Sequence, residues 1–285
     1  MKKVSFSPKA IFALWAIWAV AGAQAVFARQ SLNEDNDNIA RENVQLGRSV
    51  EFSLSVKNAN QALEFYQGLG FRETASAPAP HPVKTVTDGS IVIALHQASF
   101  PSPSVTFFGA KPKEILKILK NAKIHSEMKF DERGDIKSVE FVDLNGLRIV
   151  ARSDAGIERE GVQFEMMSLA GDNKEYSKCG MFGEFAVSTK SRDATFDFYK
   201  NFSFVRNHES NSPHPWGIYV NGITVLGVHQ SNDVQTPALT FFAKNSAERI
   251  ARLKSEGFDF LQELDPKNAI LQSPDGQLIF IFTLP

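Results

Sequence analysis

The chain of 285 residues has a single cysteine, Cys179, so no disulfide can form within it. Its 31 lysines and arginines are balanced by 32 aspartates and glutamates, and basic clusters are missing. A nucleic-acid-binding protein carries a field of positive charge, so we expect no nucleic-acid partner. The sequence also lacks a glycine-rich phosphate loop, a nucleophile elbow and a paired-cysteine metal motif, which excludes the enzyme classes that depend on them.

The longest apolar run lies at the N-terminus. Residues 2–9 include three lysines, residues 10–21 are apolar, and small residues then recur as far as Ala28. A positive segment, an apolar core and small-residue exits are typical of a cleaved secretory signal. We therefore expect residues 1–28 to be a signal peptide and the protein to be secreted or periplasmic. The alternative is an uncleaved, membrane-anchored protein, because the run as far as Ala28 is just long enough to span a bilayer.

The remainder of the chain contains an internal repeat. Residues 51–97 and 184–230 align at a constant offset of 133 without a gap, and 14 of these 47 positions are identical. A register held over that length indicates a duplicated domain. Several identical positions are polar and are not required by hydrophobic packing. In the first copy they are Glu51, Ser55, Lys57, Tyr66, His81, His96 and Gln97, and each recurs 133 positions later.

The repeat also sets the expected domain organisation. Residues 29–48 are polar and have no apolar periodicity, which indicates a flexible leader. The two copies predict domains over residues 49–152 and 183–285, each of a size that can form its own core. Residues 153–182 are then expected to be the linker.

Apolar periodicity predicts the elements of each domain. Residues 52–56 alternate apolar and polar side chains, which predicts a half-buried strand, and helical spacing follows over residues 60–69. Further strands are predicted over residues 84–87 and 90–97, whereas residues 74–83, which include three prolines, are predicted to be loop. The same order recurs, so each domain is expected to contain two β-α-β-β-β modules.

These motifs resemble a known superfamily. The strand and helix of the first copy, with Phe65-Tyr66 and Gly70-Phe71, and the closing turns Asp143-Leu144-Asn145-Gly146 and Ser273-Pro274-Asp275-Gly276, resemble the vicinal oxygen chelate superfamily. It includes glyoxalase I, bleomycin-resistance proteins and extradiol dioxygenases. The resemblance covers residues 50–152 and 183–284, and implies an α+β fold. It implies two tandem glyoxalase-like domains, in each of which two βαβββ modules form a cupped mixed sheet with helices outside.

The resemblance also implies where a metal would lie. Enzymes of this superfamily hold a divalent metal inside the cup, with ligands from the first and last strand of each module. The corresponding positions here are Glu51, Ala94, Ser104 and Val150 in the first domain, and Glu184, Gly227, Ala238 and Phe280 in the second. Catalytic sites usually need about three protein ligands, and only the two glutamates can serve. We therefore expect the standard metal site to be lost and no cofactor to be required.

Strand parity places a set of repeated side chains on the cup side of each sheet. They are the predicted ligand-binding residues: Glu51, His96, Thr106 and Phe108 in the first domain, and Glu184, His229, Thr240 and Phe242 in the second. Three interpretations stay open for them. They form a buried polar core, a small-molecule site with the phenylalanine as a platform, or a displaced metal site. In the last case the metal candidates are Glu51, His96, Glu184 and His229, completed by water or ligand.

Another repeated motif is a histidine between two prolines, Pro80-His81-Pro82 and Pro213-His214-Pro215. The prolines stiffen the loop around each histidine. We favour a rigid loop with a partly exposed histidine over a contact at the rim of the cup. Trp216, which follows the second motif, is expected either to stack on a ligand or to cover the edge of the cup.

The sequence thus favours an exported glyoxalase-like protein that binds a small molecule in the cupped sheet without being an enzyme. The bleomycin-resistance proteins that it resembles bind their ligand on this fold without chemistry. One alternative is a divalent-metal-dependent lyase or ring-cleaving dioxygenase of the same superfamily. A second is a structural or interaction module of the cell envelope. The expected partner is a small molecule, with a membrane only if the N-terminal segment stays uncleaved, and the chain is expected to be a monomer or a homodimer.

Overall fold

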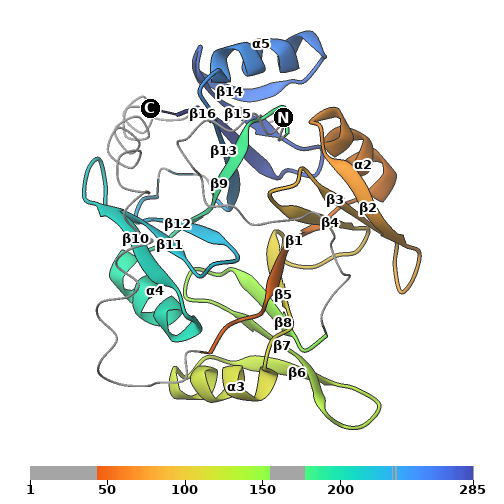
Figure 1. Cartoon of the computed structure of the whole chain (residues 1–285), viewed down its shortest axis with the longest axis vertical. Helices are drawn as coiled ribbons and strands as arrows, with labels where there is room; N and C mark the ends of the chain where they lie inside the picture. The colour runs from red at the N-terminus through yellow and green to blue at the C-terminus, as the bar shows by residue number, and fades with distance from the viewer. Residues whose placement is uncertain (1–43, 155–176, 233, 235, 285) are drawn as a thin grey trace.

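The computed structural model describes residues 44–154, 177–232, 234 and 236–284 (Figure 1). The expected signal peptide, most of the expected leader and most of the expected linker lie outside these residues. Of the helices that the structure describes, none combines the length and the apolar character needed to cross a membrane.

The first domain contains two modules of the same order. The first module consists of β1 (Ser49–Ser55), α2 (Ala59–Gly68), β2 (Arg72–Ala77), β3 (Val83–Thr87) and β4 (Val92–His96). The second consists of β5 (Ser104–Phe108), α3 (Pro112–Asn121), β6 (Ser126–Phe130), β7 (Ile136–Val142) and β8 (Arg148–Arg152). The predicted β-α-β-β-β order is confirmed in both modules.

The second domain repeats this order. Its first module consists of β9 (Met181–Ser188), α4 (Arg192–Tyr199), the 3-10 turn η4 (Lys200–Phe202), β10 (Val205–Ser210), β11 (Trp216–Val220) and β12 (Val225–His229). Its second consists of β13 (Ala238–Ala243), α5 (Ser246–Ser255), β14 (Phe260–Asp265), β15 (Asn268–Gln272) and β16 (Leu278–Thr283). The second domain therefore begins its first strand two residues before the expected start at Gly183.

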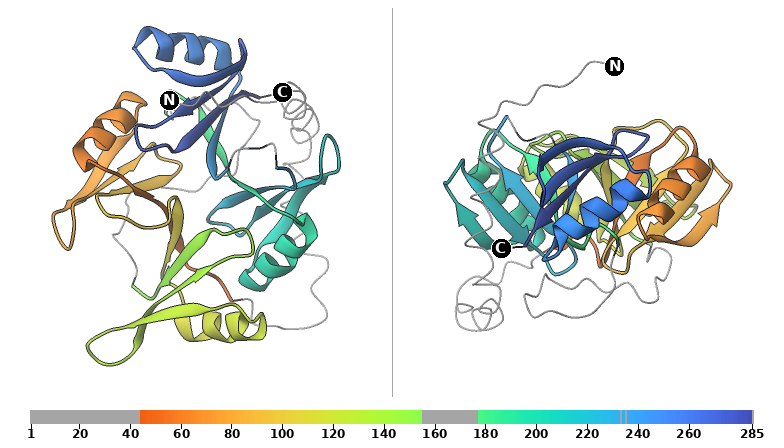
Figure 2. Two further views of the ribbon diagram at one scale, coloured as in Figure 1. Left: turned by 180° about the vertical axis from the view of Figure 1, so that it is seen from behind. Right: turned by 90° about the horizontal axis from the view of Figure 1, so that it is seen from above.

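Each domain forms one mixed sheet of eight strands. The strand order is β2-β3-β4-β1-β5-β8-β7-β6 in the first sheet and β10-β11-β12-β9-β13-β16-β15-β14 in the second. The two modules of a domain join where β1 pairs antiparallel with β5, and where β9 pairs antiparallel with β13. The four modules follow one another around the molecule, with helices α2, α3, α4 and α5 at its periphery (Figures 1 and 2). This confirms the predicted α+β fold.

The helix-facing sides of both sheets share a continuous apolar core. Phe52 of β1 stacks on Phe185 of β9, its equivalent in the repeat, with ring centroids 4.9 Å apart. Phe65 of α2 contacts Phe258 of the second domain, and Phe141 of β7 contacts Phe198 of α4. Aromatic pairs of this kind add to the hydrophobic stabilisation. The two repeats are therefore held together by their own repeated phenylalanines.

The prediction of a loop over residues 74–83 is wrong in part, because β2 continues as far as Ala77. This strand lies at the edge of the first sheet and pairs only with β3. Most of its residues are exposed, so its sequence has no apolar alternation that would mark it as a strand. The other edge strands, β6, β10 and β14, are exposed or half-buried in the same way and were not located from the sequence.

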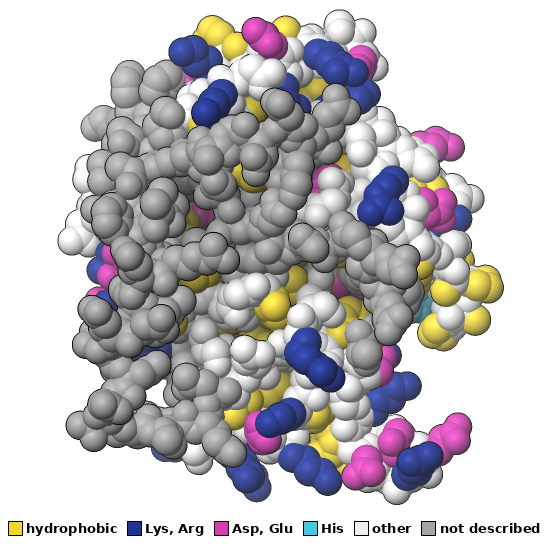
Figure 3. Space-filling view, in the orientation of Figure 1, with side chains coloured by type: hydrophobic (Ala, Val, Ile, Leu, Met, Phe, Trp, Pro, Cys, Tyr) yellow, Lys and Arg dark blue, Asp and Glu magenta, His cyan; other side chains and the backbone are white. Residues whose placement is uncertain are grey.

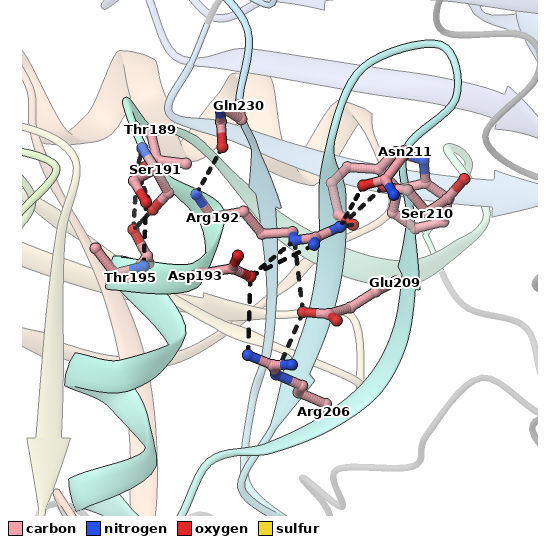
Figure 4. A network of polar contacts seen from close by, with 12 residues as sticks. Thr189, Ser191, Arg192, Asp193, Thr195, Arg206, Glu209, Ser210, Asn211 and Gln230 are labelled. Carbon is pink, nitrogen blue, oxygen red and sulfur yellow. Dashed lines mark hydrogen bonds and ion pairs between the residues drawn. The ribbon is translucent and has the colours of Figure 1, made fainter.

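Each domain fixes the start of its first helix with the same two devices. Asn58 caps α2 and Ser191 caps α4, in both cases by accepting backbone N–H groups of the first turn. The repeated glutamines supply a further acceptor: the Gln97 side chain accepts from the Ala59 N–H, and that of Gln230 accepts from Arg192. Figure 4 shows the contact of Gln230 at the start of α4. The repeat of this glutamine is thus explained by helix capping.

The surface carries no large field of one charge on the face that Figure 3 shows. Lysines and arginines lie among aspartates and glutamates over the visible, described part of that face. In one polar network, the positive charges of Arg192 and Arg206 are balanced by the negative charges of Asp193 and Glu209 (Figure 4). This network joins the start of α4 to the edge strand β10.

Candidate functional site

The structure places the predicted site residues of the first domain on the face opposite the apolar core. Glu51 of β1 lies directly across from Thr106 of β5, and His96 lies at the end of β4. Phe52 of β1 and Ile93 of β4 point to the opposite side of the sheet and belong to the core on the helix side. This face of the first sheet, with the loops that border it, is called the first cup below, and the equivalent face of the second sheet is called the second cup.

In the first cup, three repeated polar side chains form a chain of contacts. His81 Nε2 lies 3.1 Å from His96 Nδ1, and His96 Nε2 lies 3.9 Å from Glu51 Oε1. The first distance is a hydrogen bond, and the second is an ion-pair contact that is too long for a direct hydrogen bond. The histidine of the Pro-His-Pro loop therefore adjoins the histidine of the cup.

The second cup repeats this chain with a shorter inner contact. His214 Nε2 lies 3.4 Å from His229 Nδ1, and His229 Nε2 lies 3.2 Å from Glu184 Oε1. Both His229 and Glu184 are buried, whereas His96 of the first cup is half-buried. The same three residue types are thus assembled twice from three separate segments of each repeat.

These contacts correct our interpretation of the Pro-His-Pro loop. The preferred expectation was a rigid loop with a partly exposed histidine, rather than a contact at the rim of the cup. Both histidines are half-buried, so the expected partial exposure is present. The structure also places His81 and His214 against the cup histidines at hydrogen-bond distance. The signal was present in the sequence, because a histidine that recurs between the same prolines in both repeats needs a reason beyond loop stiffness.

The β7–β8 side of the first cup carries charged and polar groups. Arg148 of β8 binds the Glu140 carboxylate through Nε and Nη2, and its Nη1 donates to Ser104 Oγ at 3.2 Å. Its guanidinium also lies 5.3 Å from the centre of the Phe100 ring, a cation–π contact. Phe100 in turn packs edge-on against His96, with centroids 5.5 Å apart.

The predicted residue Phe108 lies at the end of β5 and belongs to a second such arrangement. The Arg152 guanidinium lies 5.5 Å from the centre of the Phe108 ring. Arg152 also forms a two-point ion pair with Asp154, with contacts of 2.8 and 2.9 Å. Sequence reasoning missed Arg148, Arg152 and Phe100 as members of this face, because none of them is repeated in the second domain.

The second cup is apolar where the first is polar. Strand pairing places Leu278, Phe280 and Phe282 of β16 where the first domain has Arg148, Val150 and Arg152. They pack with Ala238, Ile270 and Phe242 in one hydrophobic cluster. The predicted ligand platform Phe242 is therefore part of an apolar filling and is only 1 % exposed.

Trp216 closes the same cup from the side. It is 1 % exposed and lies parallel to the His229 ring, with centroids 6.4 Å apart. The equivalent position in the first domain is Val83, which pairs with His96 and is half-buried. Of the two roles expected for Trp216, its burial fits the covering of the cup edge.

The side chains of the cups do not fit the metal that the resemblance implies. Of the eight ligand positions, only Glu51 and Glu184 carry a carboxylate or imidazole. In His96 and in His229, one ring nitrogen faces the loop histidine and the other faces the glutamate. The three side chains of each cup therefore lie in a row and do not converge on one point. Within the described residues, no three His, Cys, Asp or Glu side chains are grouped as a metal ion requires.

In the second cup, the lost ligand position is filled by the carboxylate itself. Gly227 of β12 has no side chain, and a Cβ atom built there would lie 2.0 Å from Glu184 Oε2. The carboxylate therefore occupies the space that a ligand side chain from the last strand of that module would need. In the first cup this position is Ala94, whose Cβ keeps the Glu51 carboxylate from taking the same place.

A cleft of about 760 Å³ borders the first cup. It lies between the β4–β5 loop of the first domain and the second domain, and Phe100, Ser102, Lys57 and Gln277 are among the residues that line it. This volume is within the range of about 300 to 1,000 Å³ that is typical of small-molecule sites. Phe100 of the first cup lines this cleft, and so does Leu278 of the second cup.

The single cysteine is not a candidate nucleophile. Cys179 is fully buried, and burial raises the pKa of its thiol to about 12. A reactive cysteine needs a lowered pKa and access to solvent. The chemistry of the described residues is therefore concentrated in the two cups.

Comparison with known proteins identifies the fold. No protein-family model matches the sequence, and no curated sequence matches it. A mutant of homoprotocatechuate 2,3-dioxygenase from Brevibacterium fuscum superposes with a TM-score of 0.54 and 12 % identity, over 84 % of this chain and 72 % of that one. A mutant of 4-hydroxymandelate synthase from Streptomyces coelicolor gives 0.52 and 13 %, over 81 % and 90 %.

A third solved structure supports the same assignment. The 2,2',3-trihydroxybiphenyl 1,2-dioxygenase from Sphingomonas wittichii strain RW1 superposes with a TM-score of 0.51 and 16 % identity, over 84 % of this chain and 90 % of that one. The chain therefore has the fold of the vicinal oxygen chelate superfamily, as the sequence motifs predict. At these identities the likeness establishes the fold and leaves the reaction open.

Proposed function

We propose that the chain binds a small, oxygen-rich or aromatic molecule in the first cup, and that the second cup serves the fold. The observation that supports this most directly is the difference between the two cups. They share a glutamate, a histidine and a threonine, but the first is lined with polar and charged side chains and the second is filled with apolar ones.

The lining of the first cup indicates the class of ligand. Arg148 and Glu140 form a charged pair on this face, Ser104 accepts from Arg148, Glu51 supplies a second carboxylate, and Phe100 supplies an aromatic face. A few convergent polar groups beside an aromatic ring are typical of sites for small polar ring compounds. Phe100 lines the cleft and packs against His96, so the cleft is the approach that we propose for such a molecule.

The proposal is tested by converting the first cup into the second. The triple variant Ser104→Ala, Glu140→Ile, Arg148→Leu installs the residues found at the matching positions Ala238, Ile270 and Leu278. The probes are catechol, 4-hydroxybenzoate, a hydroxy acid and a sugar, and the measurement is the ligand-induced rise in melting temperature. At least one probe should stabilise the wild type, and the triple variant should lose that stabilisation.

The control is a volume-conserving change in the second cup away from the cleft, Ile270→Leu, which should retain the shift with the same probe. If no probe of these classes shifts the wild type, or if the triple variant keeps the full shift, the first cup is not the binding site. In that case the envelope structural module, with both cups filled by the protein, becomes the better interpretation.

A second candidate function is a divalent-metal-dependent ring-cleaving dioxygenase or lyase. The solved structures that share the fold include proteins named as dioxygenases of catechol-type compounds. This likeness supports the enzyme alternative more directly than it supports binding without chemistry. The donor groups of the two cups weigh against it. A metal would have to be held by Glu51 and His96, or by Glu184 and His229, with the remaining positions filled by water or ligand.

This alternative is tested by metal retention. Protein equilibrated with Fe(II), Mn(II), Ni(II) or Zn(II) and passed through gel filtration should keep well under one ion per domain if the metal site is lost, and a chelator should leave its melting temperature unchanged. Stoichiometric metal, together with oxygen consumption in the presence of catechol, would establish the enzyme instead.

A further inference from the structure

The two cups differ at one position that connects their glutamate and threonine. In the first cup, Ser53 of β1 donates to Glu51 Oε1 over 3.3 Å, and its hydroxyl lies 3.0 Å from Thr106 Oγ1. One hydroxyl group therefore joins the carboxylate of β1 to the threonine of the neighbouring strand. All three side chains are buried, so each needs a partner within the protein.

In the second cup, the residue at the position of Ser53 is Ala186. Glu184 and Thr240 lie directly across from one another in β9 and β13, as Glu51 and Thr106 do in the first domain. Within the described residues, however, neither Glu184 Oε2 nor Thr240 Oγ1 has a hydrogen-bond partner. Glu184 is 3 % exposed and Thr240 is 1 % exposed, so bulk water does not reach either atom.

A buried carboxylate oxygen without a donor is strongly disfavoured, and buried waters typically bind to such groups. Ala186 lacks the hydroxyl group that joins the two side chains in the first cup, so no side chain at this position bridges Glu184 and Thr240. The other carboxylate oxygen, Oε1, is already bound to His229 Nε2 at 3.2 Å. One small molecule that donates to Glu184 Oε2 and also hydrogen-bonds to Thr240 would therefore give both atoms a partner.

We propose that the second cup contains a buried binding site for a single water molecule between Glu184 Oε2 and Thr240 Oγ1. This water joins Glu184 to Thr240, as the Ser53 hydroxyl joins Glu51 to Thr106 in the first cup. It donates one hydrogen to the carboxylate, and it exchanges a hydrogen bond with the threonine hydroxyl, which can donate or accept. The inference does not depend on the proposed ligand site, because it concerns the other cup.

The test combines crystal structures with thermal unfolding of the full protein. The wild type should show a density peak within hydrogen-bond distance of both Glu184 Oε2 and Thr240 Oγ1. In the Ala186→Ser variant the serine hydroxyl should replace that peak, and the melting temperature should be unchanged or raised by a few degrees. The matched variant Ala186→Val places an apolar group there and should lower the melting temperature.

Three results would overturn the proposal. The first is a wild-type structure without the peak, in which Glu184 and Thr240 contact each other directly. The second is an Ala186→Ser variant that is less stable than Ala186→Val. The third is a saturable rise in melting temperature with ammonium chloride that sodium chloride does not produce and that Ala186→Ser abolishes, because the occupant would then be a cation.

Discussion

Tyr199 of α4 donates a 2.7 Å hydrogen bond to Asp143 Oδ2, across the boundary between the two domains. Asp143 also organises the β7–β8 turn, because its Oδ1 accepts from the backbone N–H groups of Asn145 and Leu147. Burial raises the pKa of Asp143, and the hydrogen bond from Tyr199 opposes that rise. The repeated tyrosine therefore stabilises a buried carboxylate of the other domain.

The first prediction is that Tyr199→Phe destabilises the protein by about 1 to 3 kcal/mol at neutral pH, the usual cost of an unpaired buried group. A raised folded-state pKa favours the native state below the unfolded pKa, and this contribution is lost as the pH rises through the folded pKa. The variant raises the pKa of Asp143 further. Its cost should therefore be largest where Asp143 is ionised and should shrink in acid.

Urea unfolding at several pH values measures this dependence. The control is Tyr66→Phe, at the equivalent position of α2, whose hydroxyl makes no hydrogen bond to a carboxylate within the described residues. That variant should show little dependence on pH over the same range. Equal pH dependence in the two variants would show that Asp143 does not rely on Tyr199.

A second prediction concerns the space above Gly227. Because a Cβ there would lie 2.0 Å from Glu184 Oε2, Gly227→Ala must displace the carboxylate and break its contact with His229. We expect a loss of about 1 to 3 kcal/mol, as for other buried groups deprived of a partner. The reciprocal variant Ala94→Gly in the first cup should cost only about 0.5 to 1 kcal/mol, the cost of glycine in a strand. Circular dichroism melting curves compare the two, and a harmless Gly227→Ala would refute the packing argument.

The third prediction concerns the N-terminal segment, which lies outside the described residues. If it is a cleaved signal, the mature protein should begin between Gln24 and Arg29, where the small residues of the cleavage positions end. Mass spectrometry of protein recovered from the cell envelope or the medium measures this. Intact Met1 in the membrane fraction would instead support the membrane anchor.

Most of the architecture could be predicted because the informative strands are half-buried. Residues 52–56 alternate in the sequence because one face of β1 meets the core and the other lines the cup. That alternation gives both the strand and the side on which Glu51 lies. The edge strands β6, β10 and β14 could not be located because they have little burial on either face.

The candidate site was predicted only where the two repeats agree. The identical positions led to Glu51 and His96, and would have led to His81 if its repetition had been weighed with theirs. The difference between the cups could not be found in that way. It depends on which side chains meet across β7, β8 and the β4–β5 loop, and the pairing of Arg148 with Glu140 appears only in the folded chain.

The last prediction separates ligand binding from stability with a matched pair of substitutions, His96→Ala and His229→Ala. His229 is 3 % exposed and is hydrogen-bonded to Glu184, so its removal leaves a buried carboxylate without its donor. We expect His229→Ala to cost about 1 to 3 kcal/mol and to leave the ligand-induced thermal shift intact.

His96 is half-buried and lies 3.9 Å from Glu51, which is also hydrogen-bonded by Ser53. His96→Ala should therefore cost less stability than His229→Ala, and it should weaken the thermal shift of any probe that stabilises the wild type. His229→Ala should thus have the larger effect on stability, and His96→Ala should have the larger effect on the ligand-induced thermal shift. The contrary result is that His96→Ala lowers the melting temperature as much as His229→Ala and leaves the ligand shift unchanged. In that case both histidines are polar core residues, and the ligand does not contact His96.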